Sequence, residues 1–370
     1  MAGAVIEDLR TCCADFVDYS RSLDAVFAAD VAERLVAFTL AGGSLIRPRF
    51  LWWALRASGG GDDAAAGALR IASALELIQS CALVHDDVMD ESAVRRGRPS
   101  LHTQIALRYP SVTEPPEPYG FPRSAAVLAG DLALSWADDL VAAVDLAPAT
   151  RATVLRIWRA MRTEMIAGQY LDLHGQATFA RSQVQAIRTV CLKTARYSVE
   201  HPIALGSAVA GADEPTTREL TVAGRYAGIA FQLRNDLLGV FGAPEVTGKP
   251  AGEDIRSGKA TYLLALAHSR ARATGSSTVT DLLRSSRETA RLSETDLATI
   301  REVLRSTGAP ALVERRIERL LRASERHLAS AGLRGPGVER LSELLRQVTG
   351  APYRETAAAP AGSGRGTAAR

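Results

Sequence analysis

The chain has 370 residues and a mass of 39.4 kDa, enough for one large domain or two ordinary ones. Its 44 basic and 41 acidic residues nearly balance, which argues against nucleic acid or a strongly charged membrane surface as a partner. No run approaches the roughly 18 to 20 apolar residues that cross a bilayer, so we expect no membrane span. The four cysteines form neither a CxxC pair nor a zinc spacing, which favours a reduced, cytoplasmic protein.

Apolar residues recur at three- and four-residue steps between residues 5 and 40, which predicts helical structure that ends at Gly42-Gly43. A second helix is predicted to begin near Pro48. A long third helix is predicted over residues 64–89, and it carries an acidic cluster at its carboxyl end.

Five prolines exclude a helix from residues 109–122, which are predicted to form a loop. Helical periodicity resumes at Ala125 and continues, with short breaks, to about Val348. Residues 351–370 are rich in Ala, Gly, Pro and Ser, which is typical of a disordered tail. The sequence therefore predicts one all-α domain over residues 1–350.

The acidic cluster consists of Asp86, Asp87 and Asp90. Positions i and i+4 share a helical face, so Asp86 and Asp90 should point the same way and need a cation between them. Oxygen ligands of this kind suit Mg²⁺, which takes few carboxylates and adds substrate phosphates. Arg95 and Arg96 follow closely, and their planar guanidinium groups match phosphate oxygens. This combination favours a diphosphate site over a solvated helix end.

Lysine occurs at only three positions, Lys193, Lys249 and Lys259, whereas the other 41 basic residues are arginine. A compact ammonium group binds phosphate as a point charge and fits where a larger guanidinium does not. We therefore interpret the three lysines as phosphate contacts, not as chance surface residues.

Residues 86–96 resemble the first aspartate-rich motif of the trans-isoprenyl diphosphate synthases, the polyprenyl synthetase family, and the chain is most similar to a geranylgeranyl diphosphate synthase. The resemblance covers roughly residues 30–350. It implies a large helical bundle around a central cavity, an isoprenoid-synthase fold. It also implies Mg²⁺ as cofactor, three ions per site, and head-to-tail condensation of isopentenyl diphosphate with an allylic diphosphate (dimethylallyl, geranyl or farnesyl).

The resemblance assigns a role to each matching residue. The implied catalytic residues are Asp86, Asp90, Lys193, Asp236 and Lys249. The implied metal ligands are Asp86, Asp87, Asp90, Asp172, Asn235, Asp236 and Asp254, with Glu253 as a helper. The implied contacts to the allylic diphosphate are Arg95, Gln169, Lys193, Thr194, Gln232, Lys249 and Lys259.

The second aspartate-rich motif departs from the family pattern Phe-Gln-x-x-Asp-Asp-x-x-Asp. Here Asn235 replaces the first aspartate and Gly239 the last, while Asp236 is retained. Asparagine offers an oxygen without a charge, so we expect weaker binding of Mg²⁺ at that position.

The isopentenyl diphosphate site of the family has Gly-Gly-Lys-x-x-Arg, and here Ser44 replaces the lysine while Arg47 is retained. Gln79 and Arg96 match the two other expected contacts. Loss of one charge-assisted contact of about 1.5 to 3 kcal/mol should weaken binding by one to two orders of magnitude without abolishing it.

The residues five and four positions before Asp86 are Cys81 and Ala82. In the family, bulky aromatic residues there stop growth at fifteen carbons, so two small residues favour geranylgeranyl diphosphate, with twenty carbons. Gly130-Asp131 also resembles a family pair, and we interpret Gly130 as a close-packing glycine without chemistry.

Two other functions remain open. A class I terpene cyclase on the same fold needs no isopentenyl site, which Ser44 and Asn235 favour, but Gly239 and Ala243 cannot supply its side-chain metal ligands. A non-catalytic partner of another synthase is the second alternative. The family resemblance further implies a homodimer.

Overall fold

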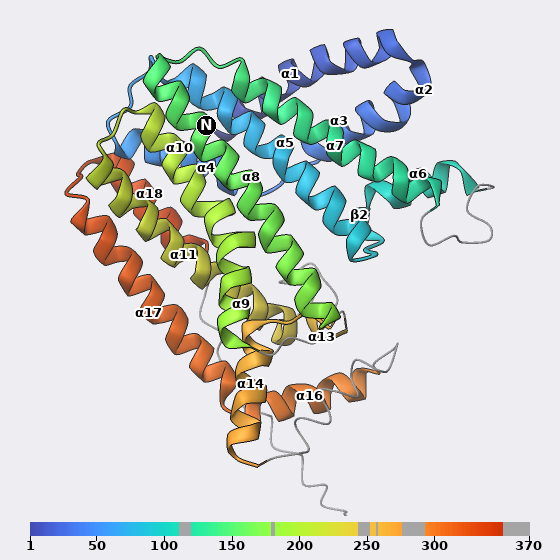
Figure 1. The fold of residues 1–370 in the computed structure, drawn as a ribbon, viewed down its shortest axis with the longest axis vertical. Coiled ribbons are helices and arrows are strands. Elements are labelled where there is room, and N and C mark those ends of the chain that lie inside the picture. The colour runs from blue at the N-terminus through green and yellow to red at the C-terminus, as the bar shows by residue number, and fades with distance from the viewer. Residues whose placement is uncertain (111–119, 179–181, 243–251, 257, 276–292, 351–370) are drawn as a thin grey trace, which may run out of the picture.

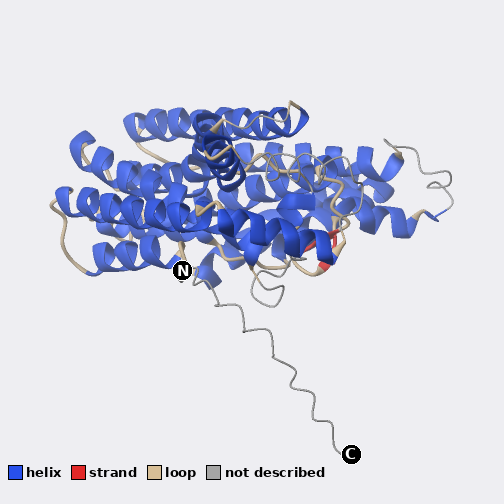
Figure 2. Ribbon diagram, turned by 90° about the horizontal axis from the view of Figure 1, so that it is seen from below, coloured by secondary structure: helices blue, strands red, loops and turns tan. Residues whose placement is uncertain are grey.

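The computed structural model describes residues 1–110, 120–178, 182–242, 252–256, 258–275 and 293–350. Within these ranges the predicted all-α fold is confirmed, because the only strands are β1 (Val94–Arg95) and β2 (Arg98–Pro99), which form a short antiparallel hairpin. Figure 2 shows this hairpin as a small feature beside the stacked helices. The predicted tail and the interior of the predicted proline-rich loop lie outside the described residues.

The helices of the described ranges are arranged as Figure 1 shows. The first half contains α1 (Ala2–Leu23), α2 (Ala25–Phe27), the π-helical η1 (Ala28–Ala32), α3 (Glu33–Leu40), α4 (Ile46–Ala57), α5 (Ala65–Met89), α6 (Leu101–Arg108), α7 (Phe121–Ala142) and α8 (Pro148–Ala177). The second half contains α9 (Gln183–Val190), the π-helical η3 (Cys191–Glu200), α10 (His201–Val209), α11 (Glu214–Phe241), α13 (Glu253–Arg256), α14 (Tyr262–Ala273), α16 (Glu294–Ser306), α17 (Ala309–Ser330) and α18 (Pro336–Gln347).

Helix α5 is the core helix of the bundle. It packs against α7, α4 and α1, and its buried side chains include Leu75, Leu77 and Ile78. Contrary to the sequence expectation, α5 is long and apolar enough to cross a membrane by length and composition. However, 67% of its most apolar stretch is buried inside the protein, and a buried core helix needs such a composition as much as a membrane span does.

A second group of helices packs around α11. This helix contacts α17 along one side and η3 along another, and η3 in turn contacts α8. Buried residues such as Leu233, Leu237 and Val313 fill the space between α11 and α17. Many of the residues predicted to form the site therefore project from α5, α8, η3 and α11, which belong to one packed bundle.

Two predicted helix boundaries were wrong. The helical run predicted over residues 5–40 is interrupted at Asp24, whose extended backbone ends α1 and whose carboxylate accepts a hydrogen bond from the Phe27 amide at 2.8 Å. Helix α7 begins at Phe121 and not at Ala125, because Pro122 is compatible with the first turn of a helix.

Candidate active site

The first acidic motif lies at the carboxyl end of α5. Glu91 and Arg96 have positive φ, so the chain turns away from the helix and the β1–β2 hairpin folds back beside the aspartates. Arg95 Nε donates to Asp87 Oδ1 at 2.7 Å, and Arg95 Nη2 donates to Asp86 Oδ2 at 3.2 Å. The guanidinium of Arg95, which the sequence assigns to a diphosphate, is therefore bound to carboxylates in this structure.

Asp86 and Asp87 differ in environment although they are adjacent. Asp87 is fully buried, and burial raises its pKa despite the contact with Arg95. Burial also opposes ionisation of Asp86, but the charges of Lys193, Lys259 and Arg95 outweigh it and hold the pKa of Asp86 below its ordinary value. Asp86 is thus the more strongly ionised of the two carboxylates.

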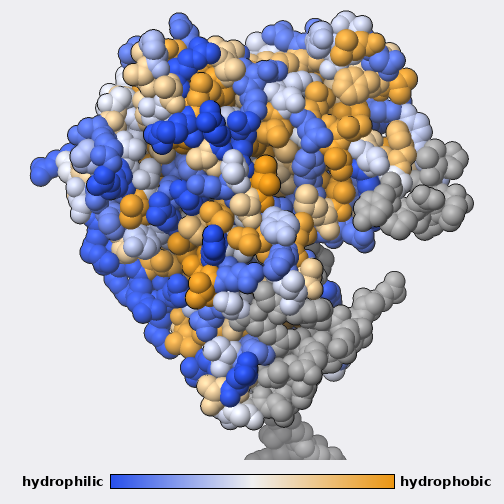
Figure 3. All heavy atoms as spheres, in the orientation of Figure 1, coloured by the Kyte–Doolittle hydropathy of each residue, from blue (hydrophilic) through white to orange (hydrophobic). Residues whose placement is uncertain are grey.

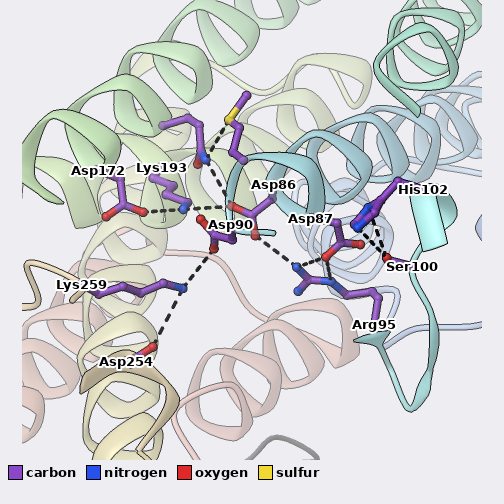
Figure 4. Close-up of polar contacts among 12 residues, drawn as sticks. Asp86, Asp87, Asp90, Arg95, Ser100, His102, Asp172, Lys193, Asp254 and Lys259 are labelled. Atoms are coloured by element: carbon purple, nitrogen blue, oxygen red, sulfur yellow. Dashed lines mark hydrogen bonds and ion pairs between the residues drawn. The ribbon is translucent and has the colours of Figure 1, made fainter. Parts of the chain in front are cut away.

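Two of the three lysines reach the aspartates from other elements (Figure 4). Lys193 Nζ of η3 lies 2.6 Å from Asp172 Oδ2 of α8 and 3.3 Å from Asp86 Oδ1. Lys259 Nζ lies 3.5 Å from Asp90 Oδ2 and 3.9 Å from Asp254 Oδ1 of α13. Each lysine therefore links the end of α5 to an acidic residue far away in the sequence.

Gln169 also contacts Asp86: its Nε2 donates to Asp86 Oδ1 at 3.2 Å. The third lysine, Lys249, lies outside the described residues, as does the side chain of Glu253.

The second acidic motif projects from α11. Gln232 Nε2 donates to Asp236 Oδ1 at 2.9 Å, and Thr194 Oγ1 donates to Gln232 Oε1 at 3.0 Å. Asp236 is 4% exposed, and burial, together with the charge of Asp254, raises its pKa to about 7. Its other oxygen, Oδ2, has no hydrogen-bond partner among the residues that the structure describes. A proton or a bound cation would satisfy such a buried, unpartnered carboxylate oxygen.

Gly239 and Asp254 are closely related in space. A Cβ atom at residue 239 would overlap the Asp254 carboxylate, so the carboxylate lies where a side chain at residue 239 would begin. Asn235, the other departure from the family pattern, is half-buried on the same helix. Asp254 thus brings a carboxylate to the helical turn from which the last aspartate of the motif is missing.

The lysines and the second acidic motif line a common cavity of about 100 Å³. Its lining includes Asp172, Lys193, Thr194, Gln232, Asp236, Asp254 and Lys259. Asp86 and Asp90 do not line this cavity themselves, but they contact Lys193 and Lys259, which do. The two lysines therefore lie between the first acidic motif and the hollow lined by the second.

The donor set fits Mg²⁺ bound together with a diphosphate. In the described part of the chain, no group of three or more His, Cys, Asp and Glu residues is close enough to hold a metal ion without other ligands. Mg²⁺ is usually held by one or two carboxylates, waters and substrate phosphates, and dispersed carboxylates around a cavity suit this kind of coordination. The unpartnered oxygen of Asp236 is available as one of these carboxylate ligands.

The predicted isopentenyl contacts form a separate group. Arg47 Nη2 donates to Ser198 Oγ at 2.7 Å, and its guanidinium lies 4.3 Å from the centre of the Tyr197 ring. Tyr197 Oη donates to Gln79 Oε1 at 3.1 Å. Arg96 donates to the Gly42 carbonyl, which anchors it on the loop that contains the exposed Ser44.

Sequence reasoning missed three residues of this second group. Tyr197 and Ser198 follow the Lys-Thr pair by four residues each, and this spacing was their only signal. Glu76 is buried, and the charges of Arg47 and Arg96 act on it. It precedes Gln79 by one helical turn, but a glutamate in an apolar run carries no sign of its partners.

The two residues predicted to set chain length differ in exposure. Cys81 is 3% exposed, its Sγ lies 3.8 Å from His85 Nδ1, and burial raises its pKa to about 12. Ala82 is half-buried. A Cβ atom on Gly130 of α7 would overlap the His85 ring, so the interpretation of Gly130 as a close-packing residue is confirmed.

Comparison with known proteins identifies the class of this chain. Its sequence matches the polyprenyl synthetase profile over residues 29–299, and the chain belongs to the polyprenyl synthetase family. This confirms the resemblance predicted from its motifs and places the chain among the prenyltransferases of isoprenoid biosynthesis.

Individual relatives differ in their products. The chain is 36% identical to farnesyl diphosphate synthase of Geobacillus stearothermophilus over 260 residues, 67% of this chain and 80% of that protein. It is 31% identical to geranylfarnesyl diphosphate synthase of Aeropyrum pernix over 279 residues, 75% of this chain and 80% of that protein.

The fold has solved counterparts. Geranylgeranyl pyrophosphate synthase from Corynebacterium glutamicum, complexed with isoprenyl diphosphate and magnesium, is similar with a TM-score of 0.85 and 36% identity, covering 94% of this chain and 98% of that one. Polyprenyl synthase from Caulobacter crescentus, complexed with calcium and isoprenyl diphosphate, is similar with a TM-score of 0.75 and 26% identity, covering 95% and 96%.

Proposed function

We propose that the protein catalyses the Mg²⁺-dependent head-to-tail condensation of isopentenyl diphosphate with an allylic diphosphate, and that its product is geranylgeranyl diphosphate (all-trans C20). The observation that carries this proposal is the hollow lined by Asp236, Lys193 and Lys259, whose two lysines also contact Asp86 and Asp90 of the first acidic motif. A diphosphate there would meet cations from the protein and carboxylates able to hold further cations.

Asp86, Asp90, Asp236 and Asp254 would hold the Mg²⁺, with three ions per site and with Asp87, Asp172 and Asn235 as further ligands. When bound, Mg²⁺ supplies Lewis-acid stabilisation of the departing diphosphate. Family membership and the magnesium bound to the relative from C. glutamicum support this assignment.

The residues of the chain orient and stabilise the reactants. Lys193, Thr194, Lys259 and Gln169 bind the allylic diphosphate, and Lys249 and Gln232 assist. Their hydrogen bonds stabilise the negative charge that develops on the diphosphate as the allylic C–O bond breaks. Arg47, Gln79 and Arg96 hold isopentenyl diphosphate so that its double bond attacks C1 of the allylic cation, and a proton is then lost to the released diphosphate.

The proposed product length is supported by the small side chains at Cys81 and Ala82. Because Cys81 is buried against His85, a phenylalanine there would disturb the packing of α5 on α7. Ala82→Phe is the cleaner test, since Ala82 is only half-buried. We expect a product shorter than twenty carbons by mass spectrometry, and an unchanged product profile would contradict the proposed role of this position.

We further propose that the enzyme is a cytoplasmic homodimer. Exposed apolar residues on α7 (Val127, Leu128) and α8 (Leu155, Ile166) support an interface there. Figure 3 shows hydrophobic residues gathered over the upper right of this face, where α7 lies, whereas the edge formed by α17 is mostly hydrophilic.

The class I terpene cyclase remains the second candidate because Ser44 and Asn235 weaken the pattern of an elongating enzyme. One assay separates the candidates: purified protein and Mg²⁺ are incubated with geranyl or farnesyl diphosphate, with and without isopentenyl diphosphate. Elongated diphosphates that require isopentenyl diphosphate support the synthase. A cyclic hydrocarbon formed without it supports the cyclase, and the absence of any product supports a non-catalytic partner of another synthase.

A further inference from the structure

The π-helical segment η3 contacts both halves of the candidate site: the allylic half around the acidic motifs and the isopentenyl half around Arg47. Near its start, Lys193 contacts Asp86 and Asp172, and Thr194 donates to Gln232. Further along η3, Tyr197 donates to Gln79 and Ser198 accepts from Arg47, and both partners belong to the isopentenyl half. A small displacement of η3 would therefore disturb both halves together.

A π-helix is rarely stable by itself and requires support from neighbouring elements. Two glycines allow its wide turns to pack closely. A Cβ on Gly168 of α8 would overlap the backbone of Lys193, and a Cβ on Gly228 of α11 would lie 2.7 Å from Ala195 Cα. The backbone of η3 is thus pressed against α8 on one side and α11 on the other.

Ion pairs hold η3 between these helices. Glu164 of α8 accepts from Arg196 Nη1 at 2.8 Å with one oxygen and contacts His201 Nε2 at 2.6 Å with the other. Glu200, at the end of η3, binds Arg225 of α11 through two contacts of 2.6 Å each. The side chains of His201 and Glu200 are 8% and 6% exposed, whereas their partners Glu164 and Arg225 are 21% and 41% exposed.

Glu164 occupies the central position in this arrangement. Arg196 lies between the residues of η3 that contact the two halves, and His201 begins α10 directly after η3. One carboxylate on α8 therefore fixes both the middle of the segment and its end.

We propose that Glu164 is a positioning residue that, through Arg196 and His201, holds η3 where Lys193 and Thr194 serve the allylic substrate while Tyr197 and Ser198 serve isopentenyl diphosphate. The inference rests on the proposed condensation reaction. Glu164 itself contacts none of the predicted substrate-binding residues in any interaction that the structure describes.

The test compares Glu164→Gln with Glu219→Gln in the full-length protein. Glu219 is a matched control because its Oε2 contacts His327 Nδ1 at 2.8 Å, and it lies near the start of α11, well before Gln232, the first predicted site residue of that helix. KM for each substrate, kcat and Tm are measured for both variants.

In Glu164→Gln we expect KM for both diphosphates to rise about tenfold and kcat to fall, since small misplacements of binding groups are costly in the transition state. Glu219→Gln should leave the kinetics unchanged and lose less thermal stability, because the His327 and Glu219 side chains are 35% and 30% exposed. Glu164→Asp, which keeps the charge, should recover part of the activity. A lower Tm with unchanged kinetics in Glu164→Gln would overturn the inference.

Gly168→Ala provides a second route to the same displacement if Glu164→Gln does not fold, because the added Cβ would push directly on the Lys193 backbone. Its KM values for both substrates should rise together, and unchanged values would overturn the inference. Wild-type protein that produces no elongated diphosphate would instead overturn the proposed function and the inference with it. Active wild-type protein with an unaffected variant would overturn the inference alone.

Discussion

The allylic half of the candidate site and its isopentenyl half hold their charges in different ways. In the allylic half, acidic side chains from α5, α8 and α13 are paired with Lys193 and Lys259, and Asp236 retains an unpartnered oxygen. In the isopentenyl half, Arg47 is held by neutral groups, the Tyr197 ring and the Ser198 hydroxyl.

This difference has a chemical consequence. Carboxylates paired with lysines can exchange those partners for metal ions and phosphate, so the allylic half is suited to a ligand that arrives with cations. Arginines held by neutral groups keep their positive charge for an anion that binds without metal. Under the proposed function, the two diphosphate substrates would therefore bind to two kinds of site.

The largest expected effect comes from removing a carboxylate from the allylic half. Asp86→Ala or Asp90→Ala should lower kcat by about 10²- to 10³-fold, because the charge of the leaving diphosphate would lose preorganised stabilisation. Steady-state kinetics at saturating Mg²⁺ measure this effect. Asp138→Asn is the control, since Asp138 accepts from Trp158 Nε1 at 2.7 Å outside the site. If the Asp86 and Asp90 variants kept their turnover, the allylic half would not depend on metal-binding carboxylates, and the contrast with the isopentenyl half would fail.

The next prediction strengthens the isopentenyl half. Ser44→Lys restores the lysine of the family pattern on an exposed loop beside Arg96 and should lower KM for isopentenyl diphosphate about tenfold, by adding one charge-assisted contact. KM for the allylic substrate should not change. Ser22→Lys, on the exposed face of α1, controls for net charge. A fall in both KM values would show that the added charge acts on the whole site.

Much of this arrangement could be predicted from the sequence because its signals are local. Asp86 and Asp90 lie one helical turn apart, and the rare lysines stand out in an arginine-rich chain. These patterns placed the acidic motif at the end of α5 and identified Lys193 and Lys259, which the structure brings beside it.

The remaining features depend on contacts between residues that are distant in sequence. Glu164 and His201 are separated by 37 residues, and Tyr197 and Gln79 by 118. The residue pattern of η3 is that of an ordinary amphipathic helix, so it does not reveal the π-helical form. The proximity of Asp254 to Gly239 depends on how α13 packs on α11. Only the packed structure reveals such pairs.

A smaller effect is expected from restoring a carboxylate on α11. Asn235→Asp should lower the Mg²⁺ concentration for half-maximal activity about threefold, because affinity for hard cations rises with the number of charged ligands. Activity measured against Mg²⁺ concentration tests this. Asn235→Ala should shift the curve in the opposite direction. An identical Mg²⁺ requirement in all three proteins would exclude residue 235 from the metal site.

The smallest effect concerns Glu76, the buried carboxyl that lies near Arg47 and Arg96 in the isopentenyl half. Burial raises its pKa above the ordinary value of 4.5, although the charges of the two arginines lower it. The folded protein therefore keeps this proton to a higher pH than the unfolded chain does. The resulting stability is fully present below pH 4.5 and is lost as the pH rises through the folded pKa.

Glu76→Gln cannot ionise, so its Tm relative to that of the wild type should be higher at pH 8 than at pH 4, as measured by thermal unfolding of the metal-free protein. Glu339→Gln, at an exposed position on α18, should show no such trend. A Tm difference that is constant with pH would mean that the arginines neutralise Glu76 fully. The isopentenyl half would then be held by an ion pair, as the allylic half is, and the contrast between the two halves would disappear.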